Sequence, residues 1–189
     1  MKSEKTMPIT ASQIAALRMK PLDRMDLLAR CGFLSMQKLR FVTCDLAERA
    51  IPCFEAHVPQ NTLLIECLLR SRADAKKGCL MERPFTCLNR TADCAAEAAE
   101  WALRRSVSNY ASAMSACMAV HAVMWATTQT KHHDILQQYV EKLTDDAKTS
   151  GVPDFFLSGQ HKGDRSRSEY EWQLNHVMEA IEEDTADAK

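Results

Sequence analysis

Glycine and proline are scarce in this chain, which has 5 glycines and 6 prolines among 189 residues. Parallel α/β enzymes need glycine where a strand turns into a helix and where the backbone approaches a phosphate. The motifs Gly-x-Gly-x-x-Gly and Gly-x-Ser-x-Gly are absent, as is the Walker-type loop. These absences argue against cofactor-loop enzymes and predict a helical protein that carries no cofactor.

An excess of positive charge is also missing. The chain has 24 Lys and Arg against 25 Asp and Glu, for a net charge of -1. A general nucleic-acid binder depends on a basic excess, so we expect no nucleic-acid partner. Hydrophobic residues make up 46% of the chain, which excludes wholesale disorder. The length predicts one domain over residues 1–189, large enough to fold without a metal or a disulfide.

The eight cysteines include no Cys-x-x-Cys pair and no Cys/His zinc spacing. The first twenty residues lack the apolar run of a signal peptide. We therefore expect free, buried cysteines in a reducing cytoplasm.

The stretch from Ser106 to Thr130 contains no Asp, Glu, Lys or Arg. It is long enough to cross a bilayer, but its many Ala, Ser, Thr, Asn and Gln residues are not typical of a membrane span. We predict a helix buried on all sides within a bundle, and no membrane association.

Apolar residues spaced three and four positions apart recur along most of the chain, whereas no run alternates for long enough to predict a sheet. The fold class is therefore predicted to be all-α, a single-domain multi-helix bundle with an Ala-rich central helix. Residues 150–168 are expected to form a mobile loop, and the acidic tail at 183–189 is expected to fray.

Few residues are candidates for chemistry. Cys117 lies one turn before His121, but their helix carries no carboxylate to orient a nucleophilic pair. His132 and His133 are adjacent and point to different helix faces, which matches no closed metal site. We predict neither catalytic nor metal-binding residues. The alternative is a helical metal-dependent enzyme or regulator that uses His121, His132 and His133.

The segment CDLAERAIPCFEAHVP at Cys44–Pro59 resembles an element of a family of immunity proteins from bacterial polymorphic-toxin systems. The matching residues are Arg49, Pro52, Phe54 and Glu55. The Ala-rich stretches at 95–102 and 111–126 look like two later helices of that family, so the resemblance covers roughly residues 36–147. It implies a small all-α cytoplasmic protein that binds a cognate toxin and has no catalysis of its own.

In such a family, a rigid helical surface covers the active cleft of the toxin, and acidic side chains pair with basic ones. We expect Asp93, Glu97 and Glu100 to form this acidic face, with Phe155 and Phe156 of the loop beside it. The C-terminal helix is the next candidate. Pro52 and Phe54 are expected to set the bend, with Arg49 and Glu55 paired across it. The sequence leaves the toxin and the oligomeric state open.

Overall fold

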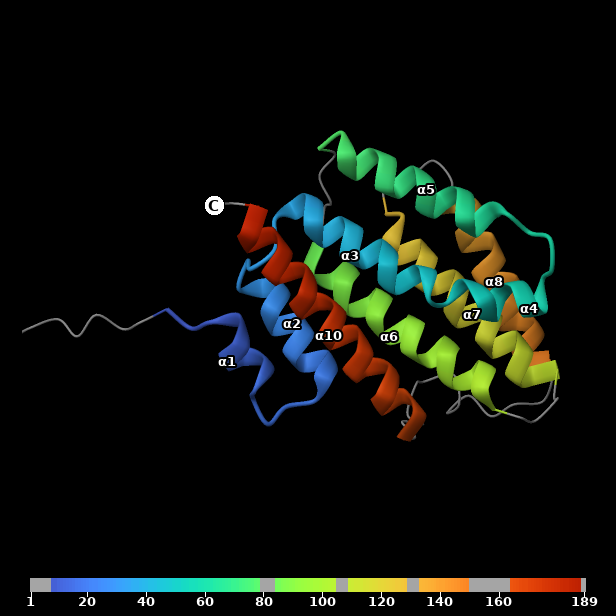
Figure 1. Ribbon diagram of the computed structural model, residues 1–189. Coiled ribbons are helices and arrows are strands. Elements are labelled where there is room, and N and C mark those ends of the chain that lie inside the picture. The colour runs from blue at the N-terminus through green and yellow to red at the C-terminus, as the bar shows by residue number, and fades with distance from the viewer. Residues whose placement is uncertain (1–7, 79–83, 105–108, 129–132, 150–163, 188–189) are drawn as a thin grey trace, which may run out of the picture.

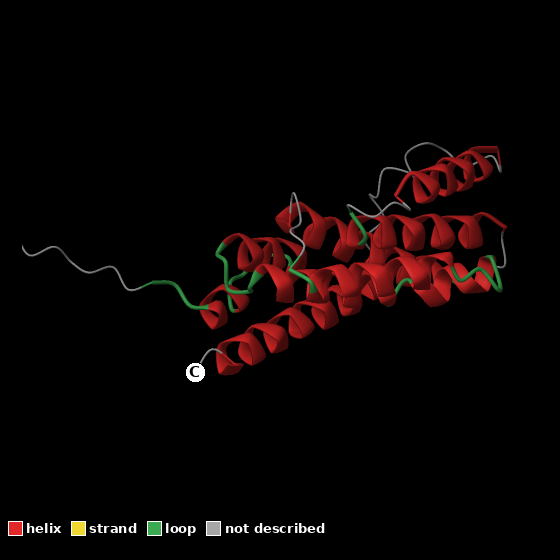
Figure 2. Cartoon of the chain, turned by 90° about the horizontal axis from the view of Figure 1, so that it is seen from above, coloured by secondary structure: helices red, strands yellow, loops and turns green. Residues whose placement is uncertain are grey.

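The computed structural model describes residues 8–78, 84–104, 109–128, 133–149 and 164–187. Every regular element within these ranges is an α-helix, which confirms the predicted all-α class. The long helices run side by side in a bundle (Figures 1 and 2). Their bounds are α1 Ala11–Ala15, α2 Pro21–Arg30, α3 Met36–Glu48, α4 Ile51–His57, α5 Leu63–Lys76, α6 Pro84–Leu103, α7 Asn109–Ala126, α8 His133–Thr149 and α10 Asp164–Asp187.

Local sequence signals account for the first helix boundaries. The Thr10 hydroxyl accepts a hydrogen bond from the Gln13 backbone, and the Gln13 side chain bonds back to the Thr10 amide, which forms a capping box for α1. Pro21 occupies the first turn of α2, and the Ser35 hydroxyl caps α3. Gly32 has a φ of +72°, in the left-handed region that glycine enters without strain, and it follows the end of α2.

Two later boundaries follow the same local rules. Pro52 lies in the first turn of α4, so the chain bends between α3 and α4 where a break was expected. The Asn61 side chain accepts a hydrogen bond from the Leu63 amide at 3.0 Å. It therefore supports the start of α5, although Thr62 occupies the cap position itself.

Helix α7 is the predicted Ala-rich central helix, and it contacts α3, α4, α5, α6 and α8. Small buried side chains on several of its sides let these neighbours approach closely: Ala113, Ala116, Ala119, Ala122 and Ala126. Within the described residues, no helix has the length and apolar character needed to cross a membrane.

The helix α10 packs against α2, α3 and α6 and closes the other side of the bundle (Figure 1). Its buried residues Leu174, Val177 and Ile181 join a core with Met25 and Leu28 of α2. The helix begins at Asp164, inside the segment 150–168 that was expected to be a mobile loop, and residues 150–163 lie outside the described ranges.

The acidic end of α10 differs from the predicted frayed tail, because the helix continues through Asp187. An oxygen of Asp184 accepts a hydrogen bond from the Ser35 amide at 2.8 Å, and Glu183 pairs with Lys38 at 2.6 Å. Both contacts lie at the start of α3, where a helix dipole favours negative charge. The tail charges are thus held by a neighbouring helix, and residues 188–189 are outside the described part.

Candidate partner-binding surface

The expected acidic face of α6 is largely covered. Tyr170 of α10 donates a hydrogen bond from its hydroxyl to an Asp93 oxygen at 2.6 Å. Glu100 is only 6% exposed and pairs with Arg104 at 3.1 Å, and Glu97 is half-buried. The predicted acidic face is therefore not an open surface, because Glu100 is buried and both Asp93 and Glu100 already have partners within the chain. Binding of a partner by these three residues stays a prediction.

Burial raises the pKa of the Tyr170 hydroxyl, and the charges of Asp93 and Glu97 act in the same direction. The hydroxyl therefore stays protonated and remains a donor to Asp93. This bond ties α10 to α6 from inside the bundle. The predicted contact residues Phe155 and Phe156 lie outside the described residues.

Two of the three histidines named in the alternative hypothesis, His121 and His133, lie within the described residues. His121 is half-buried on α7, and burial lowers its pKa, which favours the neutral ring. His133 begins α8, and His132 lies outside the described ranges. In the part of the chain that the structure describes, no three or more His, Cys, Asp or Glu side chains are grouped closely enough to hold a metal ion.

The cysteines whose positions are described are free thiols, as expected. Cys44, Cys53, Cys67 and Cys117 are buried, whereas Cys31 is exposed at the end of α2, so burial was wrongly predicted there. Burial raises the pKa of the Cys67 thiol to about 11, and it also raises the pKa of Cys44, Cys53 and Cys117. These buried thiols are therefore neutral near pH 7, which disfavours nucleophilic chemistry.

Arg49 joins the bend between α3 and α4 to helix α10. Its Nε and Nη2 donate to the two carboxylate oxygens of Glu169 at 2.7 and 2.6 Å. Glu169 is only 7% exposed and also accepts a hydrogen bond from the side-chain amide of Gln173. The expected pairing of Arg49 with Glu55 is replaced by this bond. A bidentate carboxylate fits the planar guanidinium, while Glu55 is exposed on α4.

The same guanidinium lies over an aromatic side chain. The central carbon of Arg49 is 3.7 Å from the centroid of the Trp172 ring. The Trp172 ring also stacks on His176, with centroids 5.2 Å apart and planes inclined by 8°. Trp172 is nevertheless 38% exposed. A large aromatic ring is therefore held in a defined orientation at the protein surface.

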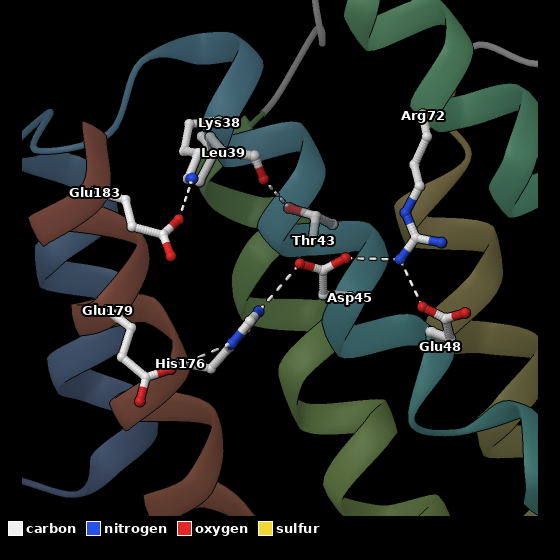
Figure 3. A network of polar contacts seen from close by, with 9 residues as sticks. All are labelled: Lys38, Leu39, Thr43, Asp45, Glu48, Arg72, His176, Glu179 and Glu183. Carbon is white, nitrogen blue, oxygen red and sulfur yellow. Dashed lines mark hydrogen bonds and ion pairs between the residues drawn. The ribbon is translucent and has the colours of Figure 1, made fainter. Parts of the chain in front are cut away.

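His176 continues the network toward α3 and α5 (Figure 3). Its Nε2 lies 3.1 Å from an Asp45 oxygen. Arg72 of α5 donates from Nη2 to Asp45 and to Glu48, both at 2.6 Å. Glu179 lies beside the other ring nitrogen of His176, at 3.9 Å. Three helices distant in sequence are therefore connected by one chain of ionic contacts.

The electrostatics of this network favour its charged forms. The hydrogen bond to Asp45 raises the pKa of His176, against the opposing effect of burial. For Asp45, burial alone raises the pKa, but the hydrogen bonds from His176 and Arg72 outweigh it and leave the pKa below its ordinary value. The protonated histidine and the carboxylate thus stabilise each other.

We define the α3–α10 surface as Arg49 and Trp172 together with the surrounding ionic residues Asp45, Glu48, Arg72, His176 and Glu179. Arg and Trp are enriched at the centres of protein–protein interfaces, within a polar rim. Sequence reasoning named Arg49 through the family resemblance but missed its partners. The available signal was Trp172, a large aromatic residue two positions from both Tyr170 and Leu174 and therefore off the apolar stripe that these two share.

Comparison with known proteins found no match for this chain. No protein-family model, no curated protein and no solved structure matches the chain. The candidate site is therefore defined by the geometry of the chain's own residues.

Proposed function

We propose that this chain is an immunity protein, which binds a cognate bacterial toxin domain in the cytoplasm and blocks the toxin's active site by occlusion. The α3–α10 surface is the contact surface. The observation that carries the proposal is the exposed Trp172 ring, held between Arg49 and His176. The resemblance of residues 44–59 to the immunity-protein element supports it from the sequence side.

A fixed aromatic ring lowers the cost of binding. Immobilising a flexible side chain at an interface costs about 0.5–1.5 kcal/mol. Trp172 is already oriented by its two stacking contacts, so less of this entropy remains to be lost. Tryptophan and arginine at the centre of an interface also contribute most strongly to affinity.

The charge around Trp172 indicates the kind of partner. Glu171, Glu179 and Glu182 are exposed on α10, and Glu48 is exposed at the end of α3; within the chain, Glu171 pairs with Arg24 and Glu48 pairs with Arg72. Such a rim attracts a basic surface, accelerating association and disfavouring acidic partners. The partner is thus a toxin whose active cleft has basic edges.

The first test is co-expression with the toxin domain encoded by the neighbouring gene. Rescue of growth and co-purification of the two chains are the expected results. A neighbouring gene that encodes no toxin, together with failure to capture one, contradicts the proposal.

The second test places the contact surface. Trp172→Ala is expected to weaken toxin affinity at least tenfold, as for other interface hot spots. Ile135→Ala is the matched control, because Ile135 is also exposed but lies on α8, which contributes no residue to the α3–α10 surface. Affinity is measured by calorimetry on variants whose thermal unfolding has been checked. Equal affinities for the two variants would place the interface elsewhere.

Charge reversal tests the acidic rim in the same assay. Glu179→Lys is expected to slow association with the toxin, and the difference should shrink at high salt. Glu141→Lys on α8 is the control, since Glu141 is exposed on a helix that does not contribute to the α3–α10 surface. Equal association rates for the two variants would show that the acidic rim is not part of the interface.

A further inference from the structure

A partly open cavity of about 220 Å³ lies where α4, the end of α6 and the start of α7 meet. Its lining includes buried Cys53, Trp101 and Ser115, and exposed His57 and Ser112. The α3–α10 surface shares none of its residues with this lining. The cavity is thus a separate feature of the fold.

The floor of the cavity offers a neutral surface. The Cys53 thiol and the Ser115 hydroxyl both donate to the Ala98 carbonyl, at 3.3 and 3.0 Å. Burial raises the pKa of Cys53, so this thiol carries no charge. Because both donors already have an acceptor, the floor favours an apolar group over a polar one.

Trp101 forms an aromatic wall whose orientation is held from two directions. The Tyr110 ring meets it edge-on, with centroids 5.4 Å apart, and the Arg104 guanidinium lies 3.8 Å from its centroid. Aromatic side chains prefer to pack against other aromatic rings in offset or edge-on geometry. The wall is therefore suited to a planar ring. An apolar protein cavity of about 150 Å³ binds benzene, so this cavity has room for one ring with a short polar arm.

The lining also supplies basic nitrogen donors. Arg104 donates from Nη2 to Glu100 at 3.1 Å. A guanidinium carries five N–H donors, more than this one bond uses. His57 lies in the last turn of α4 and also lines the cavity. A carboxylate between these two side chains receives charge-assisted hydrogen bonds.

From the neutral floor, the aromatic wall and the basic nitrogen donors, we propose that this cavity binds a small aromatic carboxylate. The ring packs on Trp101, and the carboxylate lies between Arg104 and His57. This inference goes beyond toxin binding and does not depend on it.

The direct test is titration of the purified chain with phenylacetate, followed by NMR. Saturable shifts of the Trp101 indole resonance are expected, while the resonances of Trp125 and Trp172 stay in place and serve as internal controls. Phenylacetamide keeps the ring and removes the charge, and it is expected to bind at least tenfold more weakly. Absence of saturable binding, or equal binding of acid and amide, overturns the proposal.

Variants test the location. Ser112→Phe fills the mouth of the cavity from an exposed position and is expected to abolish binding. Gln138→Phe on the exposed side of α8 is the matched control and keeps wild-type affinity. Unchanged binding by a folded Ser112→Phe variant would show that phenylacetate does not bind in this cavity. His57→Gln is expected to weaken binding of phenylacetate but not of phenylacetamide. Equal effects on the two ligands contradict the proposed carboxylate position.

Failure of the cavity proposal can be distinguished from failure of the toxin proposal. Phenylacetate binding is measured on the isolated chain, and Trp172→Ala is expected to leave it unchanged. Loss of phenylacetate binding in that variant would contradict a separate cavity. Toxin capture can fail while the cavity binds its ligand, and the reverse also holds.

Discussion

At the scale of single residues, Arg49 combines a position at a helix bend with two side-chain contacts. It lies at the bend between α3 and α4, pairs with Glu169 and stacks on Trp172. Its carboxylate partner is nearly buried, whereas Arg49 itself remains partly exposed. Removing Arg49 would leave the Glu169 carboxylate nearly buried without its counter-charge. The loss in the free energy of unfolding therefore comes mainly from Glu169.

Replacing this arginine tests that argument. Arg49→Met keeps an apolar stem and removes the charge, and it is expected to lower the free energy of unfolding by about 2–3 kcal/mol. The control is Arg30→Met, because Arg30 forms an exposed pair with Asp26. Such a pair contributes at most about 1 kcal/mol. Urea unfolding measures both variants, and equal losses would show that Glu169 is not effectively buried.

His176 makes stability depend on pH. Its pKa in the folded state is raised above the ordinary 6.5 by Asp45, with Glu179 and Glu183 acting in the same direction. The stabilisation is thus complete below pH 6.5 and is lost as the pH rises through the folded pKa. Asp45, whose pKa is lowered, stays ionised throughout this window.

We expect the urea midpoint of the wild type to fall between pH 5.5 and 8.5 by more than that of His176→Gln. The exposed His57 supplies a control variant, His57→Gln, which should follow the wild-type profile. Parallel profiles for the wild type and His176→Gln would mean that the bond to Asp45 does not favour the protonated ring.

At the scale of elements, the end of α7 is held by a buried arginine. Arg40 of α3 is 4% exposed, and its Nη2 donates to the Thr128 carbonyl at 3.0 Å. Its Nε donates to the Ser71 hydroxyl, which in turn donates to the Ala126 carbonyl, both at 2.6 Å. A positive charge is favourable beside carbonyls at the C-terminal end of a helix.

This arrangement predicts a large effect from a single substitution. Arg40→Met removes the charged donor from the buried Ser71 hydroxyl and from the half-buried Thr128 carbonyl, and it should cost about 2–4 kcal/mol. Arg18→Met, at an exposed position near α1, is the control and should change little. Amide hydrogen exchange should accelerate at the end of α7 in the Arg40 variant. Unchanged protection of these amides from exchange would show that Arg40 does not stabilise the end of α7.

At the scale of the whole molecule, α10 completes the bundle. It covers α2, α3 and α6, and its side chains meet Leu88, Ala92 and Ala96 of α6 in one core. Val177 is fully buried in that core, whereas Asn175 two positions earlier is exposed. The two positions allow a matched test of whether α10 is integral to the fold.

Val177→Asp buries a carboxylate without a partner and is expected to cost about 4 kcal/mol or more. Asn175→Asp adds the same group at the surface and should stay within about 0.5 kcal/mol of the wild type. Circular dichroism during thermal unfolding measures both. A small loss in Val177→Asp would show that the remaining helices fold without α10.

Local chemistry in the sequence accounts for several helix starts. Thr10, Pro21, Ser35 and Pro52 act within one turn of their own position, so their effects are visible without a fold. The uncharged stretch likewise predicted a central helix, because a helix without charged side chains can be buried on every face.

The candidate surface was decided only by tertiary structure. Helical periodicity shows that a face is polar but not whether another helix covers it, and Tyr170 of α10 bonds to Asp93 on the face that was expected to bind a partner. Arg49 meets Glu169 across 120 positions of sequence. Such a pair depends on how whole helices pack, because hydrophobic burial brings α10 against α3 and the ionic partners follow from that placement.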